Sequence, residues 1–280
     1  MNNPDWLTPR WPAPAGVRAV FTTRQGGVSL PPFDTMNLGG HVGDSVAAVA
    51  ANRLILQRAI GCQPVFLQQV HGTEVLELSH GSVDGLAADA CLTRQRGLAC
   101  TVMVADCLPV LFAHLDQPVV AAAHAGWRGL AGPPRIATPA NAGQTPFDGI
   151  LEATFRHFAA SADAAQDAVA PRTIAWLGPC IGPTAFEVGA EVKAAFEAVQ
   201  PAAGAMFLPV AGKVDQTKYL ADLPGLARLR LNALGITQIY GNDGTDDWCT
   251  VSRPLQFFSH RRDAVGGRST GRMAACVWQV

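Results

Sequence analysis

The segment from Gly97 to Trp127 is the most apolar part of the chain and constrains the fold more than any other segment. It contains two apolar runs, Leu108–Ala113 and Pro118–Ala123, separated by four residues that suit a hairpin loop. Asp106, Asp116 and two prolines interrupt the segment, so it does not match a membrane-spanning helix. The pattern predicts strands buried in the middle of a sheet.

The same hairpin predicts where two reactive side chains meet. If Ala113 faces Pro118 across the loop, then Cys107 faces His124 on the neighbouring strand. Directly opposed residues of an antiparallel pair have Cβ atoms roughly 5 Å apart. Pro109 and Pro118 fit this register poorly, because proline cannot donate a ladder hydrogen bond. The register nevertheless brings a thiol and an imidazole within reach of one metal ion.

A third candidate ligand is His71, which follows the apolar run Pro64–Val70, a predicted strand. Two imidazoles and one thiolate suit zinc, and three protein ligands leave one coordination position open for water or substrate. Copper also binds imidazole and thiolate, so it can occupy the same ligands. The alternative interpretation is a buried thiol and two histidines that are satisfied within the core.

The composition is that of a well-buried globular protein. Of the 280 residues, 49% are hydrophobic and 15% are charged, and the net charge of −1 gives no reason to expect nucleic acid as a partner. Seven cysteines without a C-x-x-C pair argue against a disulfide framework and against a ribbon-type structural zinc site. The N-terminal residues lack the pattern of a signal peptide. We therefore expect a cytoplasmic protein without a membrane partner, and no feature indicates a protein partner.

Predicted strands outnumber predicted helices, and several strands follow one another through short turns, which is typical of an α+β fold with mixed sheets. Strand patterns cover residues 17–23, 64–70, 98–105, 108–113, 118–124, 173–177, 236–240 and 274–280. Helix patterns cover residues 149–160, 191–199, 223–234 and a segment capped by Asp44 or Ser45 that ends at Gly61. Pro133–Pro146 is rich in proline and small residues and predicts a surface loop.

Seven blocks spread over nearly the whole chain form a further pattern. They are Phe21-Thr-Thr-Arg-Gln-Gly-Gly27, Asn37-Leu-Gly-Gly-His-Val-Gly-Asp44, Gln69-Val-His-Gly-Thr-Glu74, Ala105-Asp-Cys107, His124-Ala-Gly-Trp-Arg-Gly129, Leu177-Gly-Pro-Cys-Ile-Gly-Pro183 and Phe257-Phe-Ser-His-Arg-Arg-Asp263. Together, and in this order, they resemble the laccase-domain (YfiH-type) purine nucleoside phosphorylase family, once called multicopper polyphenol oxidoreductases.

The resemblance implies one α/β/β/α-layered domain over residues 1–280 and a zinc site at His71, Cys107 and His124. It also implies phosphorolysis of adenosine, inosine and 5′-methylthioadenosine, and deamination of adenosine to inosine. Purine nucleosides and phosphate are therefore the expected partners. Bound zinc can lower the pKa of a water molecule to about 7, which would supply hydroxide for deamination. The insert Pro133–Pro146 departs from the family pattern, as does the long turn 266–272.

Three further residues are predicted to hold substrate or phosphate. Arg24 lies on a Gln-Gly-Gly turn whose backbone amides can face an anion, and Asn37 precedes a capped helix. Arg128 follows His124 by four residues. The alternative interpretation of the first two is that they belong to ordinary tight turns.

Deamination also requires a proton shuttle, usually a carboxylate. Asp106 precedes Cys107, but strand alternation points it to the opposite face, so we expect it to bind backbone amides instead. Glu74, Asp89 and Asp222 stay open as candidates.

Three other functions use the same residues. A copper-dependent phenol oxidase is one, although seven histidines without an H-x-H pair do not support a multicopper cluster. A cysteine hydrolase is another, with Cys107 as nucleophile and His124 as base, acting on amides such as those of cell-wall precursors. In the third, zinc is a structural staple, with Cys180 or Cys249 as fourth ligand. We expect Cys180 instead to be a buried, small hydrophobic residue.

Two further groups of residues are expected to carry no chemistry. Arg261-Arg262-Asp263 predicts an internal ion-pair network that holds the C-terminal segment. The four histidines at 41, 80, 114 and 157 have no ligand-like spacing.

Overall fold

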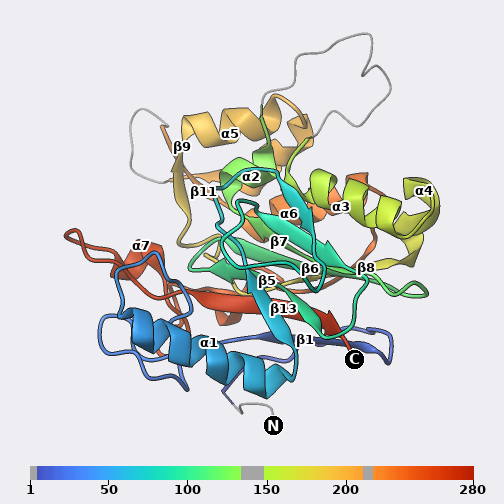
Figure 1. Cartoon of the computed structure of the whole chain (residues 1–280). Coiled ribbons are helices and arrows are strands. Elements are labelled where there is room, and N and C mark those ends of the chain that lie inside the picture. The colour runs from blue at the N-terminus through green and yellow to red at the C-terminus, as the bar shows by residue number, and fades with distance from the viewer. Residues whose placement is uncertain (1–4, 134–147, 211–216) are drawn as a thin grey trace.

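Two β-sheets are stacked face to face in the centre of the molecule, and helices cover their outer faces (Figure 1). The computed structural model describes residues 5–133, 148–210 and 217–280. The first sheet has the strand order β1 (Val17–Phe21), β13 (Met273–Gln279), β5 (Leu98–Val104) and β2 (Gln63–Phe66). The second has the order β12 (Gln238–Gly241), β8 (Thr173–Leu177), β6 (Leu108–His114), β7 (Val120–Ala125), β4 (Ala90–Thr93) and β3 (Val75–Glu77).

A small third sheet and the helices complete the architecture. The third sheet has the order β10 (Phe207–Pro209), β11 (Lys218–Ala221) and β9 (Glu187–Gly189). The α-helices are α1 (Val46–Ile60), α2 (Trp127–Ala131), α3 (Ile150–Ser161), α4 (Gln166–Val169), α5 (Ala190–Glu197), α6 (Leu223–Ala233) and α7 (His260–Asp263). Short 3-10 helices are η2 (Ala170–Arg172), η3 (Pro201–Met206) and η4 (Asp246–Trp248). None of the described helices is long and apolar enough to cross a bilayer.

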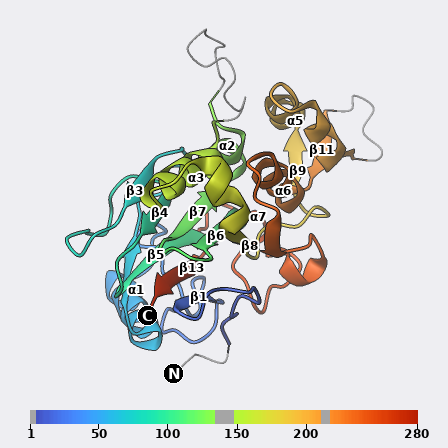
Figure 2. The ribbon, with the colours of Figure 1, turned by 90° about the vertical axis from the view of Figure 1, so that its right-hand side faces the viewer.

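The first sheet is apolar on both faces, which places it between two layers. Side chains alternate between the faces of a strand. Along β5, Val102 and Val104 pack toward the second sheet, whereas Met103 packs with Leu56 of α1. Figure 2 shows α1 and α3 on opposite sides of the stacked sheets.

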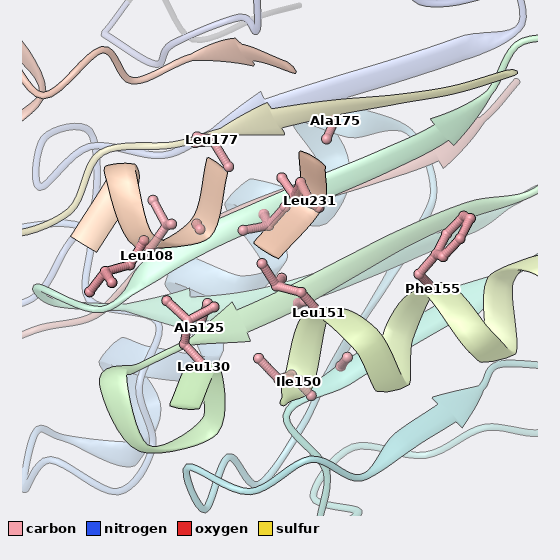
Figure 3. Packing of buried hydrophobic residues seen from close by; sticks show 14 of the residues in the cluster. Leu108, Ala125, Leu130, Ile150, Leu151, Phe155, Ala175, Leu177 and Leu231 are labelled. Carbon is pink, nitrogen blue, oxygen red and sulfur yellow. The ribbon is translucent and has the colours of Figure 1, made fainter. Parts of the chain in front are cut away.

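The second sheet is also covered on both faces, and Figure 3 shows its outer core. Leu151 and Phe155 of α3 and Leu231 of α6 belong to one apolar cluster with Ala175 and Leu177 of β8. Strands of both sheets pair in parallel and antiparallel directions, for example β6 antiparallel to β7 and β12 parallel to β8. The predicted α+β fold with an α/β/β/α arrangement is confirmed.

Helix α1 begins and ends where its sequence predicts. The Ser45 side chain accepts a hydrogen bond from the backbone N–H of Ala48, which satisfies one of the free donors at the helix start. Gly61 follows the last turn with a φ of 71°, a left-handed conformation that favours glycine.

The predicted hairpin register is wrong by two residues. Ala113 pairs with Val120 rather than with Pro118, and His124 therefore lies opposite Pro109. The physical reason is the loop, because Pro118 has no N–H to donate and stays outside the ladder. Cys107 lies just before β6, so it does not face His124 directly.

Several elements differ from the predicted ones. β2 ends at Phe66, so the strand predicted over residues 64–70 is too long. The sequence patterns did not predict β3, β4, the third sheet, α2, α4 or α7, all of which are short. The predicted loop Pro133–Pro146 lies outside the described residues except for Pro133.

Candidate metal centre

Three side chains from separate segments meet at one end of the central strands β6 and β7 of the second sheet. His71 lies in the loop after β2, Cys107 precedes β6, and His124 lies near the end of β7. One ligand atom from each lies within 4.8 Å of the others, and Cys107 Sγ is 3.7 Å from His71 Nε2. The two imidazole rings stand at 73° to each other. The arrangement can hold one metal ion, with the donor types that zinc prefers.

A buried carboxylate, Asp89, fixes both histidines. Its Oδ1 accepts hydrogen bonds from His124 Nδ1 at 2.8 Å and from the His71 backbone N–H at 2.9 Å. Its Oδ2 accepts from the backbone N–H groups of Val70 and Gly72. Because Nδ1 of His124 donates to a carboxylate, its Nε2 is left to bind a metal, as in carboxylate–histidine–zinc triads.

The three hydrogen bonds from backbone N–H groups to Asp89 hold His71 in an unusual backbone conformation. His71 has a φ of 62°, in the left-handed region that costs a residue with a Cβ free energy. Asp89 accepts from the N–H groups on both sides of this residue, so it stabilises the turn that aims the imidazole at Cys107.

Two glycines let the ligands come close. A Cβ at position 126 would lie 2.8 Å from Cδ2 of His71 and 3.1 Å from Sγ of Cys107. A Cβ at position 129 would lie 2.8 Å from the carbonyl oxygen of Gly72. The two distances of 2.8 Å are too short for a real Cβ, so the glycines in His124-Ala-Gly-Trp-Arg-Gly129 make room for the cluster.

The imidazoles change the acidity of the thiol. Burial alone raises the pKa of the Cys107 thiol, but the charge and hydrogen bonds of His124 and His71 outweigh it and bring the pKa to about 6. Burial lowers the pKa of His124, but the Cys107 thiolate and the Asp89 carboxylate outweigh it and bring the pKa to about 9. Each group therefore favours the charged form of the other, a thiolate beside an imidazolium.

Asp106 holds the segment that carries Cys107. It lies between β5 and β6 with a φ of 91°, so strand alternation does not apply to it. Its Oδ2 accepts from the backbone N–H of Arg261 at 2.6 Å and its Oδ1 from the Thr250 hydroxyl at 2.6 Å. The Asp106 carbonyl accepts from Ile181 N–H. The expectation that Asp106 binds backbone amides agrees with its bond to the Arg261 N–H, and its lack of a catalytic role stays a prediction.

The ligands open onto a pocket of about 340 Å³ whose wall is cationic and apolar. Beside the ligand cluster it is lined by the basic residues Arg261 and Arg272 and by His260. The other wall residues are His41, Gln69, Met103, Val104, Ala105, Asp106, Trp127, Ile181 and Phe186. The sequence patterns assigned no role to Arg272 or His41, and Arg261 was expected to be purely structural.

The predicted substrate residues lie outside the lining of this pocket. Arg24 donates to the carbonyls of Asp34 and Pro254 and pairs with the Asp34 carboxylate at 3.3 Å. Asn37 is fully buried, and its Oδ1 accepts from the N–H groups of Gly39 and Arg272. Asn37 therefore links the pocket residue Arg272 to the loop before α1. Arg128 lies over the Trp127 ring, 4.5 Å from its centroid.

None of the three open candidates for a proton shuttle lines the pocket. Asp89 uses both oxygens to hold the ligand segments, and Asp222 caps α6 by accepting from the N–H of Gly225. Glu74 does not line the pocket. Among the described lining residues, Asp106 is the only carboxylate, and both of its oxygens are already engaged.

Cys180 and Cys249 do not complete the metal cluster. Both are fully buried, and within the described residues the cluster consists of His71, Cys107 and His124 alone. Burial raises the pKa of Cys180 well above its usual value. Its role as a buried hydrophobic residue agrees with the expectation from sequence.

The predicted ion-pair network in the C-terminal segment is present. Arg262 pairs with Asp263 at 2.7 Å and donates to the carbonyls of Thr250, Val251 and Phe257. Arg261 differs from this expectation, because its side chain reaches the carbonyls of Ala185 and Glu187 at the pocket wall.

Comparisons with known proteins agree over nearly the whole chain. A family model described as multi-copper polyphenol oxidoreductase laccase matches residues 18–280. Purine nucleoside phosphorylase PA4543 of Pseudomonas aeruginosa is 45% identical over 273 residues, which are 98% of this chain and 98% of that protein. Purine nucleoside phosphorylase YfiH of Escherichia coli is 44% identical over 276 residues, 98% of each chain. The crystal structure of protein NMB0706 from Neisseria meningitidis, 40% identical, superposes with a TM-score of 0.79 and covers 98% of this chain and 99% of that one.

Proposed function

The chain belongs to the multi-copper polyphenol oxidoreductase laccase family, and we propose that it catalyses phosphorolysis of purine nucleosides beside a metal site formed by His71, Cys107 and His124. Relatives that carry the name purine nucleoside phosphorylase support enzymatic activity and point to purine nucleosides and phosphate as substrates.

The charge of the pocket carries this proposal. Arg261 and Arg272 line it beside the ligand cluster. Among the described lining residues the one carboxylate is Asp106, and both of its oxygens accept hydrogen bonds, from the Thr250 hydroxyl and the Arg261 N–H. Among the described residues, the Arg272 guanidinium donates only through Nη1, to the carbonyls of Thr270 and Gly271, so other N–H groups can reach a ligand. Arginine is well suited to phosphate, because its planar fork can donate two parallel hydrogen bonds.

The donor set fits zinc. His124 is oriented by Asp89, the Cys107 thiol has a pKa near 6, and three protein ligands leave a position toward the pocket. Zinc bound there would supply a Lewis acid beside the substrate, and copper would fit the same ligands.

The residues of this chain contribute binding and orientation. Arg261 and Arg272 hold phosphate so that one oxygen faces the anomeric carbon of the ribose. A carbon–oxygen bond forms as the bond to the base nitrogen breaks, through an oxocarbenium-like transition state. The base leaves with the bonding electron pair and takes up the proton that hydrogen phosphate loses as it becomes the ribose 1-phosphate dianion. The apolar side chains of Trp127, Ile181 and Phe186 line the same pocket and limit competing attack by water.

The finer activities rest on the family resemblance. They are phosphorolysis of adenosine, inosine and 5′-methylthioadenosine, and deamination of adenosine. Deamination requires an acid–base group near the substrate, and the imidazoles of His41 and His260 line the pocket. Direct contact of Arg24, Asn37 or Arg128 with substrate stays a prediction, as do the cytoplasmic location and a single catalytic domain over residues 1–280.

A cysteine hydrolase is the second candidate, because one observation favours it. Asp89, His124 and Cys107 form a chain of contacts that resembles an acid–histidine–nucleophile triad. A tightly bound stoichiometric zinc would argue against this function, because a metal-bound thiolate is a poor free nucleophile. Phenol oxidation that scales with added copper and persists without the three ligands would identify an artefact.

The experiment is to incubate metal-analysed protein with adenosine, with and without phosphate, and to separate the products. We expect adenine and ribose 1-phosphate only when phosphate is present, inosine without it, and neither in Cys107→Ala. Absence of turnover despite one bound zinc per chain would contradict phosphorolysis and direct attention to amide substrates.

A further inference from the structure

A second pocket of about 500 Å³ adjoins the first, and the two share His41, Gln69 and Met103 as lining residues. The shared wall is fixed in place. The Gln69 side chain donates to the Met103 carbonyl and accepts from the Met103 N–H, both at 2.7 Å. A molecule bound at the metal centre can therefore extend past a rigid wall into the second pocket.

The second pocket contains a guanidinium held flat against an aromatic ring. Arg53 of α1 lies over the Phe66 ring, 4.0 Å from its centroid. Its Nε donates to the Leu38 carbonyl at 3.1 Å, and its Nη1 pairs with Asp84 at 3.0 Å. Asp84 also accepts from the Phe66 N–H at 2.9 Å. Three partners thus fix the plane of the guanidinium.

Part of this group is exposed to solvent. The Arg53 side chain is 26% exposed and that of Asp84 is 47% exposed. A Cβ at position 40 would lie 3.8 Å from Arg53 Nη2, so the glycine there keeps this edge uncovered. A planar guanidinium can stack on a flat heteroaromatic ring.

The two pockets differ in charge. The first contains Arg261 and Arg272 with no free carboxylate among the described lining residues, so it favours an anion. In the second, the charges of Arg53 and Asp84 compensate each other. Burial, followed by the charges of Arg272 and Arg53, lowers the pKa of His41, which keeps this imidazole neutral at pH 7. The second pocket therefore suits a neutral, planar molecule that carries N–H donors.

We propose that Arg53, Phe66 and Asp84 form the subsite for the purine base of the nucleoside, an inference that rests on the proposed phosphorolysis. The base stacks on the guanidinium face that points away from Phe66, and the Asp84 carboxylate accepts a hydrogen bond from an N–H group at the edge of the base. The nucleoside then spans the wall of Gln69 and Met103, with its ribose toward the metal centre and the phosphate.

The test uses a substitution that removes the planar guanidinium of Arg53 but keeps its positive charge. Arg53→Lys preserves an ion pair with Asp84, and Arg58→Lys is the matched control, an exposed arginine on the same helix. The Kd values of adenine and of inorganic phosphate are measured separately by calorimetry on the metal-loaded protein. We expect Arg53→Lys to weaken adenine binding about tenfold, the size of a lost stacking contact, and to leave the Kd of phosphate unchanged. Arg58→Lys should change neither Kd.

A second variant keeps the inference testable if the lysine disturbs α1. Asp84→Asn retains an oxygen for the Phe66 N–H but loses the carboxylate charge, and should weaken adenine binding several-fold. Normal adenine binding in both variants would overturn the subsite, as would an equal loss of adenine and phosphate binding.

The outcomes also separate the subsite from the proposed function. Phosphorolysis by the unmodified protein together with normal adenine binding by both variants would leave the function standing without the subsite. Adenine binding that depends on Arg53, in a protein that does not cleave nucleosides, would leave the subsite standing without the function.

Discussion

Cys107 and Cys180 lie at the same end of two neighbouring strands of the second sheet, yet their surroundings give the two thiols opposite acidity. Cys107 precedes β6 and Cys180 follows β8, and these two strands are paired. Two imidazoles bring the pKa of Cys107 to about 6, whereas burial raises the pKa of Cys180 well above its usual value. Burial alone makes a cysteine inert, and an imidazole held by a carboxylate favours the thiolate, which is the form that binds a metal.

Removing each thiol in turn should give the largest difference. We expect Cys107→Ala to weaken zinc binding by a factor of at least about 100 and to abolish nucleoside cleavage, because a site with only two ligands is left. Cys180→Ala should keep metal and activity and lose about 1 kcal/mol of stability from a small cavity. Metal analysis, turnover and denaturant unfolding measure the three quantities. Equal metal affinity in both variants would remove the distinction between the two cysteines.

Loss of the carboxylate behind the histidines should have the next largest effect. Asp89→Asn is expected to weaken zinc binding about 10- to 100-fold, because the His124 ring and the turn at His71 lose their anchor. The control is Asp222→Asn, which alters the cap of α6 and should cost about 1 kcal/mol or less of stability without changing metal affinity. Competition with a chromophoric chelator measures the affinity. An unchanged Kd for Asp89→Asn would contradict this role.

Two glycines provide a smaller, matched comparison. Gly126→Ala puts a methyl group against His71 and Cys107, so we expect zinc affinity to fall about tenfold as the ligands shift apart. Gly182→Ala puts a methyl group 3.0 Å from Cβ and Sγ of Cys249. This should lower the stability by about 1–3 kcal/mol and leave the metal affinity unchanged. The two effects are measured by chelator competition and by thermal unfolding. A loss of metal affinity in Gly182→Ala alone would reverse the assignment of the two thiol sites.

The smallest expected effect is on the pH dependence of thiol alkylation in metal-free protein. The pKa of Cys107 is lowered to about 6, so its reactive thiolate forms as the pH rises through that value and persists above it. The alkylation rate should therefore change by no more than about twofold between pH 7 and pH 8.5, whereas an ordinary thiol would react about tenfold faster per pH unit there. Peptide mapping after iodoacetamide treatment separates Cys107 from Cys180, which should stay unmodified. A rate that still climbs steeply above pH 7 would show that the imidazoles do not activate the thiol.

The layers of the fold and the meeting of three candidate ligands were readable from sequence for definable reasons. Buried strands carry apolar residues on both faces, and Ser45 and Gly61 mark the two ends of α1 by their own conformational preferences. His71, Cys107 and His124 stand in blocks whose order along the chain resembles one family.

Other features depend on contacts that no local pattern contains. The hairpin register depends on where Pro118 leaves the ladder. Asp89 directly precedes β4, a four-residue strand that is buried at every position and so shows no alternation of apolar and polar residues. Arg272 reaches the pocket because β13 lies between β1 and β5, a pairing of distant segments. The Phe257–Asp263 block was the one local signal that pointed to Arg261 and His260.

Anomalous diffraction at the zinc edge from crystals of the zinc-loaded protein tests the central claim most directly. The account predicts one zinc peak within bonding distance of His71 Nε2, Cys107 Sγ and His124 Nε2. It also predicts a hydrogen bond from His124 Nδ1 to Asp89 and a fourth coordination position that is open to the pocket. A peak at Cys180 or Cys249, or a fourth protein ligand that closes the site, would contradict it.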